Sequence, residues 1–212
     1  MTNARPIAFT ALLAAVAFLP LAACETPAQR IDPGGTQTIT TVGDLDIQDA
    51  QYAASQLSES LLASGVLGQD GRPSVIAIST YVNNTSRHID RDEVIKTIRV
   101  ALNKAGVAQT ITTIDDTGAV GGEDAIASRH QRYRDQDAAV DSFAEGGSGE
   151  VRPPMPDYSL TFKILDDRAQ AGKIKQVTYI FQMSVTDVRT GLAAWEDQVL
   201  VTKQGSRNTV GW

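Results

Sequence analysis

The sequence has little of what enzyme active sites and metal centres are built from. Its 212 residues include one cysteine and two histidines, His88 and His130. The two histidines are not at metal-ligand spacing, and a single cysteine supplies no thiolate pair. The chain has no Gly-x-Ser-x-Gly nucleophile turn, and residues 146–149 lack the Gly-Lys-Ser/Thr ending of a phosphate-binding loop. We therefore expect a protein that is not an enzyme, with no metal, no cofactor and no small-molecule substrate.

Two pairs of neighbouring carboxylates, Asp115-Asp116 and Asp166-Asp167, are the remaining candidates for acid–base chemistry. Both pairs fall where the pattern predicts turns, and Asp is common at turns because its side chain bonds to nearby main-chain groups. A structural role at turns is therefore the favoured interpretation, and a catalytic pair is the alternative.

Basic residues are outnumbered, with 19 Lys and Arg against 25 Asp and Glu and a formal net charge of −6. An acidic surface repels phosphate groups, which argues against nucleic acid and anionic lipid headgroups as partners. Apolar residues make up 42% of the chain, enough for one domain with a substantial core.

Only one long apolar run is present, from Ile7 to Leu19, and Arg5 is the only charge before it. The run is followed by Leu21-Ala22-Ala23-Cys24, which resembles the bacterial lipobox. A charged start, a short apolar core and small residues before a cut site are typical of a secretory signal. We expect a signal peptide over residues 1–23 and lipidation of Cys24, palmitate included. A plain signal peptide is one alternative, and a membrane-spanning anchor is another, although the run is shorter than the ~20 residues a span needs.

The N-terminal region after the cut site, residues 24–44, is rich in Thr, Pro and Gly and has neither helical nor strand periodicity. We expect a flexible tether, which spans roughly 25 Å as a coil and roughly 70 Å when stretched. Glu25 follows the cysteine, whereas Asp at that position is the usual retention signal for the inner membrane. Resemblance to sorted lipoproteins therefore implies anchoring in the outer membrane, with the domain facing the periplasm.

The middle of the chain predicts alternating helices and strands. Apolar residues at three- and four-residue spacing predict a helix from Asp46, its N-cap, to Gly65, its stop. A second helix is predicted to start at Asp90 and to stop at Gly106. Strands are predicted at 75–78, buried on both faces, and at 107–114. Residues 123–145 are helical in composition but weakly amphipathic.

The last third shows the alternation of half-buried strands at 158–164, 177–185 and 195–201, with turns at Ala171-Gly172 and Thr190-Gly191. The whole pattern predicts an α/β fold: a two-layer domain with a mixed, mostly antiparallel sheet flanked by helices. We expect a globular domain over residues 45–203 and a C-terminal tail over 204–212.

The connection between the first strand and the second helix carries a dense run of hydrogen-bonding side chains: Asn83, Asn84, Thr85, Ser86, Arg87 and His88. These side chains could satisfy main-chain groups where a strand meets a helix. They could instead form a partner-binding loop that projects Arg87 and His88. The sequence leaves both interpretations open.

Several segments in matching order resemble the LpoB family of lipoprotein activators of penicillin-binding proteins. They are residues 73–76, 82–90, 96–102, 156–161, 175–181, 186–192 and Trp195-Glu196, after a matching lipobox. The resemblance covers most of residues 46–203.

The resemblance implies a fold related to the N-terminal domain of TolB and a partner, a bifunctional penicillin-binding protein. Such a lipoprotein reaches from the outer membrane, docks on the peptidoglycan synthase and stimulates cell-wall synthesis without being an enzyme. The alternative is a subunit related to CsgG-type secretion lipoproteins. Those pores need added membrane-spanning hairpins with strands of about 9–11 residues, and no such insertion is visible in the sequence.

Overall fold

The computed structural model describes residues 28–32, 35, 41, 43–113, 122–141 and 155–206. The predicted signal peptide, Cys24, Asp115-Asp116 and residues 207–212 lie outside the described residues.

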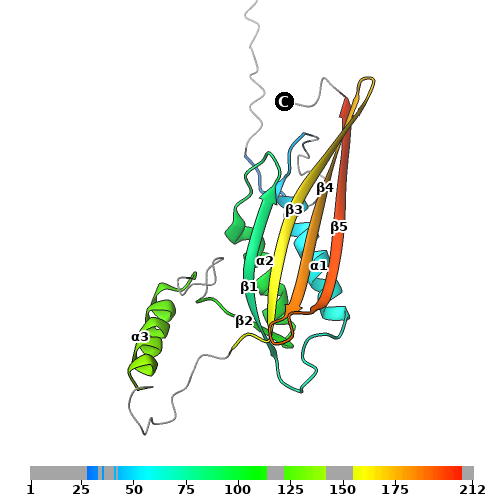
Figure 1. Cartoon of the computed structure of the whole chain (residues 1–212). Helices are drawn as coiled ribbons and strands as arrows, with labels where there is room; N and C mark the ends of the chain where they lie inside the picture. Colours follow the sequence, from blue (N-terminus) through cyan, green and yellow to red (C-terminus); the bar gives the residue numbers. More distant parts are fainter. Residues whose placement is uncertain are drawn as a thin grey trace, which may run out of the picture.

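The described elements follow the predicted order of helix, strand, helix, strand, helix and three strands (Figure 1). Their bounds are α1 Ile47–Ala63, β1 Ser74–Asn84, α2 Arg91–Lys104, β2 Ala108–Thr110, α3 Ala125–Asp141, β3 Tyr158–Ala171, β4 Ile174–Asp187 and β5 Ala193–Ser206.

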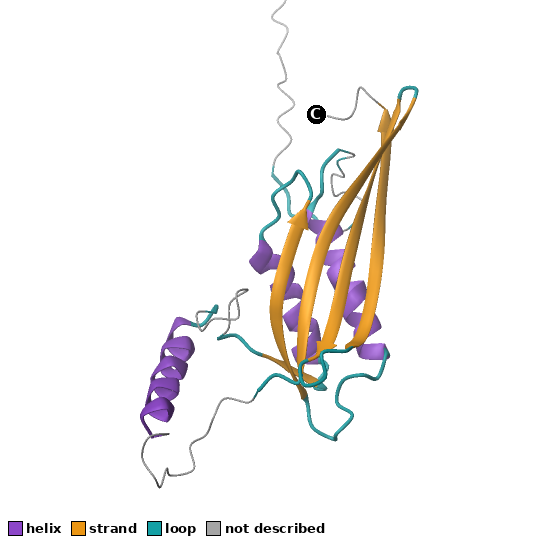
Figure 2. Ribbon diagram, viewed as in Figure 1, coloured by secondary structure: helices purple, strands orange, loops and turns teal. Residues whose placement is uncertain are grey.

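The five strands form one sheet in the order β2-β1-β3-β4-β5. β1 pairs in parallel with β2 and β3, over 3 and 8 residue pairs, while the antiparallel ladders β3–β4 and β4–β5 join 14 and 13 pairs. Helices α1 and α2 lie on one face of this sheet, and none of the described helices lies on the other face (Figure 2). The predicted two-layer α/β fold with a mixed, mostly antiparallel sheet is confirmed.

Both packed helices begin at the aspartates that the sequence indicates. Asp46 is the N-cap of α1 and forms a capping box with Asp49. Asp90 is the N-cap of α2 and accepts hydrogen bonds from the main-chain NH groups of Asp92 and Glu93. These caps satisfy main-chain NH groups of the first helical turn, which have no carbonyl partner within the helix. The caps therefore fix where the preceding loops end.

The core lies between the two helices and the covered face of the sheet. Its fully buried side chains include Leu57, Leu61, Ile76, Ile98, Leu102, Leu160, Phe162, Ile164, Tyr179 and Phe181. Phe162 stacks on Tyr81 at a centroid distance of 6.1 Å and lies 6.3 Å from the ring of Phe181. As predicted, the strand segment 75–78 is buried throughout, with exposed fractions of 0–8%.

The strands extend further along the chain than the apolar alternation indicates. The prediction that Asp166-Asp167 lies in a turn was wrong, because the pair lies inside β3, where Asp166 pairs with Tyr179 of β4. Beyond Ile164, β3 carries mainly polar side chains on both faces, so its apolar alternation ends while the main-chain ladder to β4 continues. Asn83 and Asn84 likewise belong to β1. Conversely, β2 is shorter than the predicted 107–114.

The third helix, α3, stands apart from the sheet in Figure 1. It covers Ala125–Asp141, inside the predicted 123–145. Its weak amphipathicity accounts for this placement, because a helix without a wide apolar stripe gains little from packing on a core.

Candidate functional site

The predicted partner-binding segment forms the end of β1 and the loop to α2. The side chain of Asn83 bridges the loop. Its NH₂ group donates to the carbonyl of Arg87 at 2.8 Å. Its oxygen accepts hydrogen bonds from the main-chain NH and the hydroxyl of Thr85, at 3.0 and 2.7 Å. The same hydroxyl lies 3.1 Å from the Arg87 carbonyl, an alternative acceptor for its one proton. Asn83 and Thr85 therefore satisfy main-chain and hydroxyl groups within the loop, which is the first of the two interpretations.

The other four residues of the segment face outward. Asn84, Ser86, Arg87 and His88 are exposed, whereas the next residue, Ile89, is 6% exposed and anchors the loop in the core. A rigid loop that presents four polar side chains to solvent is what the second interpretation requires. The structure therefore shows the first role for Asn83 and Thr85, and partner binding by the four exposed residues stays a prediction.

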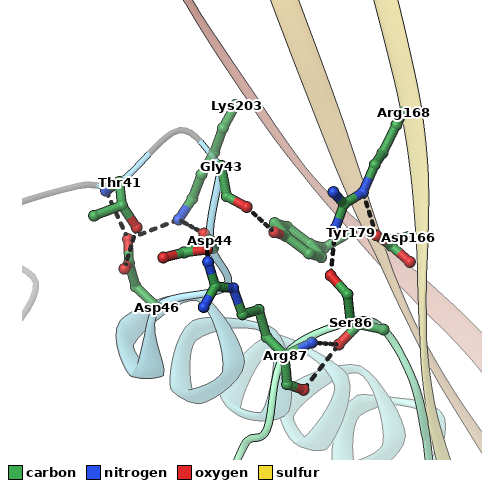
Figure 3. A network of polar contacts seen from close by, with 11 residues as sticks. Thr41, Gly43, Asp44, Asp46, Ser86, Arg87, Asp166, Arg168, Tyr179 and Lys203 are labelled. Carbon is green, nitrogen blue, oxygen red and sulfur yellow. Dashed lines mark hydrogen bonds and ion pairs between the residues drawn. The ribbon is translucent and has the colours of Figure 1, made fainter. Parts of the chain in front are cut away.

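The exposed part of the loop is next to the last residues of the predicted tether (Figure 3). The Arg87 guanidinium forms an ion pair with the Asp44 carboxylate. On the other side of the loop, Arg168 of β3 donates to the Ser86 hydroxyl at 2.5 Å and pairs with Asp166 at 2.8 Å. The loop is thus contacted by the tether on one side, through Arg87, and by β3 on the other, through Ser86.

A buried lysine holds this tether end in place. The Lys203 ammonium of β5 contacts the Asp46 carboxylate at 2.7 Å, the main-chain carbonyl of Asp44 at 3.0 Å, and the Asp49 carboxylate. Its side chain is only 6% exposed. A buried ammonium needs partners for its three donors, and the capping box of α1 together with the tether end supplies them.

Asp46 connects the lysine to the chain before it. Its carboxylate also accepts from the main-chain NH of Thr41 at 3.0 Å and the Thr41 hydroxyl at 2.6 Å. Burial alone would raise the pKa of Asp46, but the hydrogen bonds from Lys203 and Thr41 outweigh it and leave the pKa below its usual value. Beneath them, burial raises the pKa of Tyr179 to about 12, and its hydroxyl points toward the carbonyl of Gly43 at 3.5 Å.

Sequence reasoning identified the loop and the N-cap Asp46 but missed Lys203, Asp44 and Arg168. One signal for Lys203 was present: Val199, Val201 and Lys203 share the face of β5 that points to the core. A lysine in register with inward-facing valines requires a buried acidic partner. The identity of that partner, more than 150 positions away in the sequence, could not be read from a strand pattern.

Replacing Lys203 with methionine should lower the free energy of unfolding by about 2–3 kcal/mol at pH 7. Removing one partner of a fully buried ion pair lowers stability by about 3–5 kcal/mol. Here the loss is smaller, because Asp46 and Asp49 keep 18% and 14% of their side-chain area exposed and water can solvate the carboxylates that remain. Because the pKa of Asp46 is lowered in the folded state, the difference should be complete at pH 7 and shrink as the pH falls below 3.8.

Urea denaturation at pH 7 and pH 3 measures this difference. Lys173→Met is the matched control, since Lys173 is exposed in the turn between β3 and β4. An equal, small loss of stability in both variants would show that Lys203 has no such role.

A second ion pair lies at the opposite end of the sheet. Arg72 forms a two-bond pair with Asp157, at 2.9 and 2.6 Å, and Asp157 also accepts from the main-chain NH of Val75 at 2.8 Å. The Arg72 hydrogen bond is the main reason that the pKa of Asp157 is below its usual value. This pair fixes the start of β3 against β1 and has a structural role.

A cleft of about 790 Å³ runs along α2. Three of its charged side chains pair with each other: Glu123 contacts Lys96 at 2.7 Å and also Arg99. Over the described ranges, no group of three or more His, Cys, Asp or Glu side chains is placed to hold a metal ion. In the same part of the chain, the helices are too short or too polar to cross a membrane.

Residues 49–201 match the family model described as "Peptidoglycan-synthase activator LpoB". The chain belongs to the LpoB family. The match runs from the first turn of α1 into β5 and therefore includes the loop, four whole strands and most of the fifth. The resemblance on which the sequence prediction rested is confirmed, and it places the protein in the regulation of peptidoglycan synthesis, as a member of an activator family rather than an enzyme family.

Solved structures of the LpoB C-terminal domain are among the similar proteins. The domain from Salmonella enterica is 19% identical, with a TM-score of 0.41, and the alignment covers 72% of this chain and 98% of that one. The Escherichia coli domain is 17% identical with the same TM-score and coverage. Lipoprotein GNA1162 from Neisseria meningitidis is 13% identical, with a TM-score of 0.29, over 66% of this chain and 87% of that one. The comparison with curated proteins gives no match.

Proposed function

We propose that the protein is an outer-membrane lipoprotein, anchored through Cys24, that binds and activates a bifunctional penicillin-binding protein in the periplasm. The family match over residues 49–201 is the observation that carries this proposal. The lipobox-like Leu21-Ala22-Ala23-Cys24 supports the anchor, and Glu25 supports the outer membrane. The match does not favour the alternative, a CsgG-related secretion subunit.

The docking surface in this proposal is the outward-facing part of the segment from Asn83 to His88. Asn84, Ser86, Arg87 and His88 supply exposed polar groups, and Asn83 and Thr85 hold the loop rigid. A preformed loop loses little conformational freedom on binding, which favours affinity. Activation follows if the domain binds the active form of the synthase more tightly than the inactive form and so raises its population.

The test is lipid-II polymerisation by the organism's own bifunctional synthase, with and without the full-length lipoprotein in detergent. We expect stimulation that saturates with the lipoprotein. An unchanged rate at saturating lipoprotein would rule out the activator function. The lipoprotein alone should neither polymerise nor cleave glycan.

Arg87→Glu should weaken docking by about tenfold while leaving the melting temperature nearly unchanged. The Arg87 side chain is 48% exposed, so its charge contributes little to folding, whereas reversing a charge at an interface creates repulsion. Titrating the stimulation of the synthase gives the half-saturating concentration.

Arg189→Glu is the matched control, because Arg189 is an exposed arginine in the turn between β4 and β5, at the opposite end of the sheet. If Arg87→Glu docks with wild-type affinity, the docking surface does not include Arg87, and the proposed activator function is unaffected.

A further inference from the structure

The contact between the loop and the tether end consists of two parts that differ in burial. We define the tether end as residues 41, 43 and 44. One part is the cluster around Lys203, and the other is the single ion pair between Asp44 and Arg87 (Figure 3). Both parts act on Asp44, the first through its main chain and the second through its side chain.

The part around Lys203 is fixed. The ammonium is 6% exposed, lies 6.0 Å from the centroid of the Tyr179 ring, and contacts two carboxylates and the Asp44 carbonyl. A buried charge with all its donors satisfied does not exchange partners easily. The main chain at Asp44 is therefore held close to the loop whether or not its side chain is paired.

The part at Arg87 is exchangeable. The side chains of Arg87 and Asp44 are 48% and 35% exposed, and ion pairs with this exposure gain little over hydration and are weakened by salt. A carboxylate from another molecule can therefore replace that of Asp44. Guanidinium groups bind carboxylates in a two-bond, planar geometry, so the competing group has the same chemistry as the one now in place.

The two guanidinium groups at the loop are each paired with a carboxylate of this chain, Arg87 with Asp44 and Arg168 with Asp166. Arg168 also donates to the Ser86 hydroxyl from β3. A partner that displaces Asp44 must therefore present an acidic group to Arg87, because a guanidinium left without a carboxylate is electrostatically unmatched.

We propose that Asp44 is an internal competitor: it occupies the site on Arg87 that an acidic side chain of the docked partner takes. This inference rests on the proposed function, since it concerns docking at the same loop. The last residue of the tether then lowers the affinity of the loop for carboxylates, and a partner with an Asp or Glu in the right place displaces it. The surface thereby selects an acidic partner and disfavours weaker contacts.

The competition can be expressed as a change in affinity. When a site is open for only part of the time, the apparent affinity is reduced by that open fraction. An exposed ion pair typically keeps such a site closed for somewhat more than half of the time, so removing the competitor should tighten binding by roughly threefold. Asp44→Asn is the direct variant, because it removes the charge but keeps the main-chain carbonyl that Lys203 contacts.

The experiment measures the affinity of full-length lipoprotein for the organism's own bifunctional synthase, both in detergent, by fluorescence titration. Four proteins are compared: wild type, Asp44→Asn, Arg87→Gln and the double variant. Glu59→Gln is the control for net charge, since Glu59 is exposed on α1 and the variant loses the same negative charge. Melting temperatures verify that the Lys203 cluster is intact.

We expect Asp44→Asn to bind about threefold more tightly and Glu59→Gln to bind as wild type does. We expect the double variant to bind as weakly as Arg87→Gln, because a competitor has no effect once its site is gone. Equal or weaker binding by Asp44→Asn, or an equal gain in Glu59→Gln, would overturn the competitor while leaving docking established. If no variant binds the synthase, the proposed function fails, and this inference fails with it.

Discussion

Phe181→Ala is expected to lower the free energy of unfolding by about 3–5 kcal/mol, enough to unfold much of the population of a marginally stable domain. Phe181 is 0% exposed and lies in β4, between Ile164 of β3 and Val199 of β5. Its ring contacts Phe162 at a tilt of 45°. Removing the ring leaves a cavity in the middle of the core, where the ladders on both sides prevent the strands from closing over it.

Urea denaturation of the lipid-free chain from residue 25, followed by circular dichroism, measures this loss. Leu200→Ala is the matched control: Leu200 is in the neighbouring strand on the face without helices and is 55% exposed, so its loss should be below about 1 kcal/mol. Similar losses in the two variants would show that the covered face is not the core. Wild-type unfolding should be unchanged by chelator or reductant.

The fold was largely predictable because its signals are local. The helix caps Asp46 and Asp90, the helical spacing in α1 and α2 and the alternation in the last three strands each lie within a short window. Strand ends were not predictable in the same way. The outer part of the β3–β4 hairpin has no helix to pack on, so its length is set by main-chain pairing and leaves no apolar pattern.

The candidate site was predictable only in part, for a related reason. The polar run from Asn83 to His88 is visible in the sequence, but which side chains turn inward depends on the path of the loop. Asn83 bonds to Arg87 four residues away, which no spacing rule requires. The contacts of Arg87 with Asp44 and of Arg168 with Ser86 join segments 43 and 82 positions apart, and these depend on how the sheet is assembled.

These contacts also bear on where the tether ends. The sequence predicts a tether over residues 24–44, and Gly43 and Asp44 already contact Tyr179, Lys203 and Arg87. Since those contacts lie beside the proposed docking loop, the point at which the chain leaves the domain is next to the surface that is proposed to meet the partner. A lipid attached at Cys24 would therefore limit the distance of that surface from the membrane.

The Cys24→Ser variant is expected to abolish lipidation altogether and to leave an uncleaved precursor that still carries residues 1–23. Cys24 is the only cysteine in the chain, so no other thiol can take the lipid. A serine hydroxyl is a much weaker nucleophile than a thiolate, and in lipoprotein processing the lipid is attached before the signal is cut. Mass spectrometry of the N-terminal peptide and fractionation of the membranes measure the two effects.

Glu25→Asp is the matched control for that experiment, because it keeps the lipid and changes only the residue that resembles a sorting signal. It should be lipidated and cleaved like wild type but should remain in the inner membrane. The two variants separate lipid attachment from sorting, since the first removes the lipid and the second redirects the lipidated protein. Wild-type protein that is cleaved before Cys24 and carries an unmodified thiol there would disprove lipid anchoring, and with it the placement of the docking loop within a tether's reach of the outer membrane.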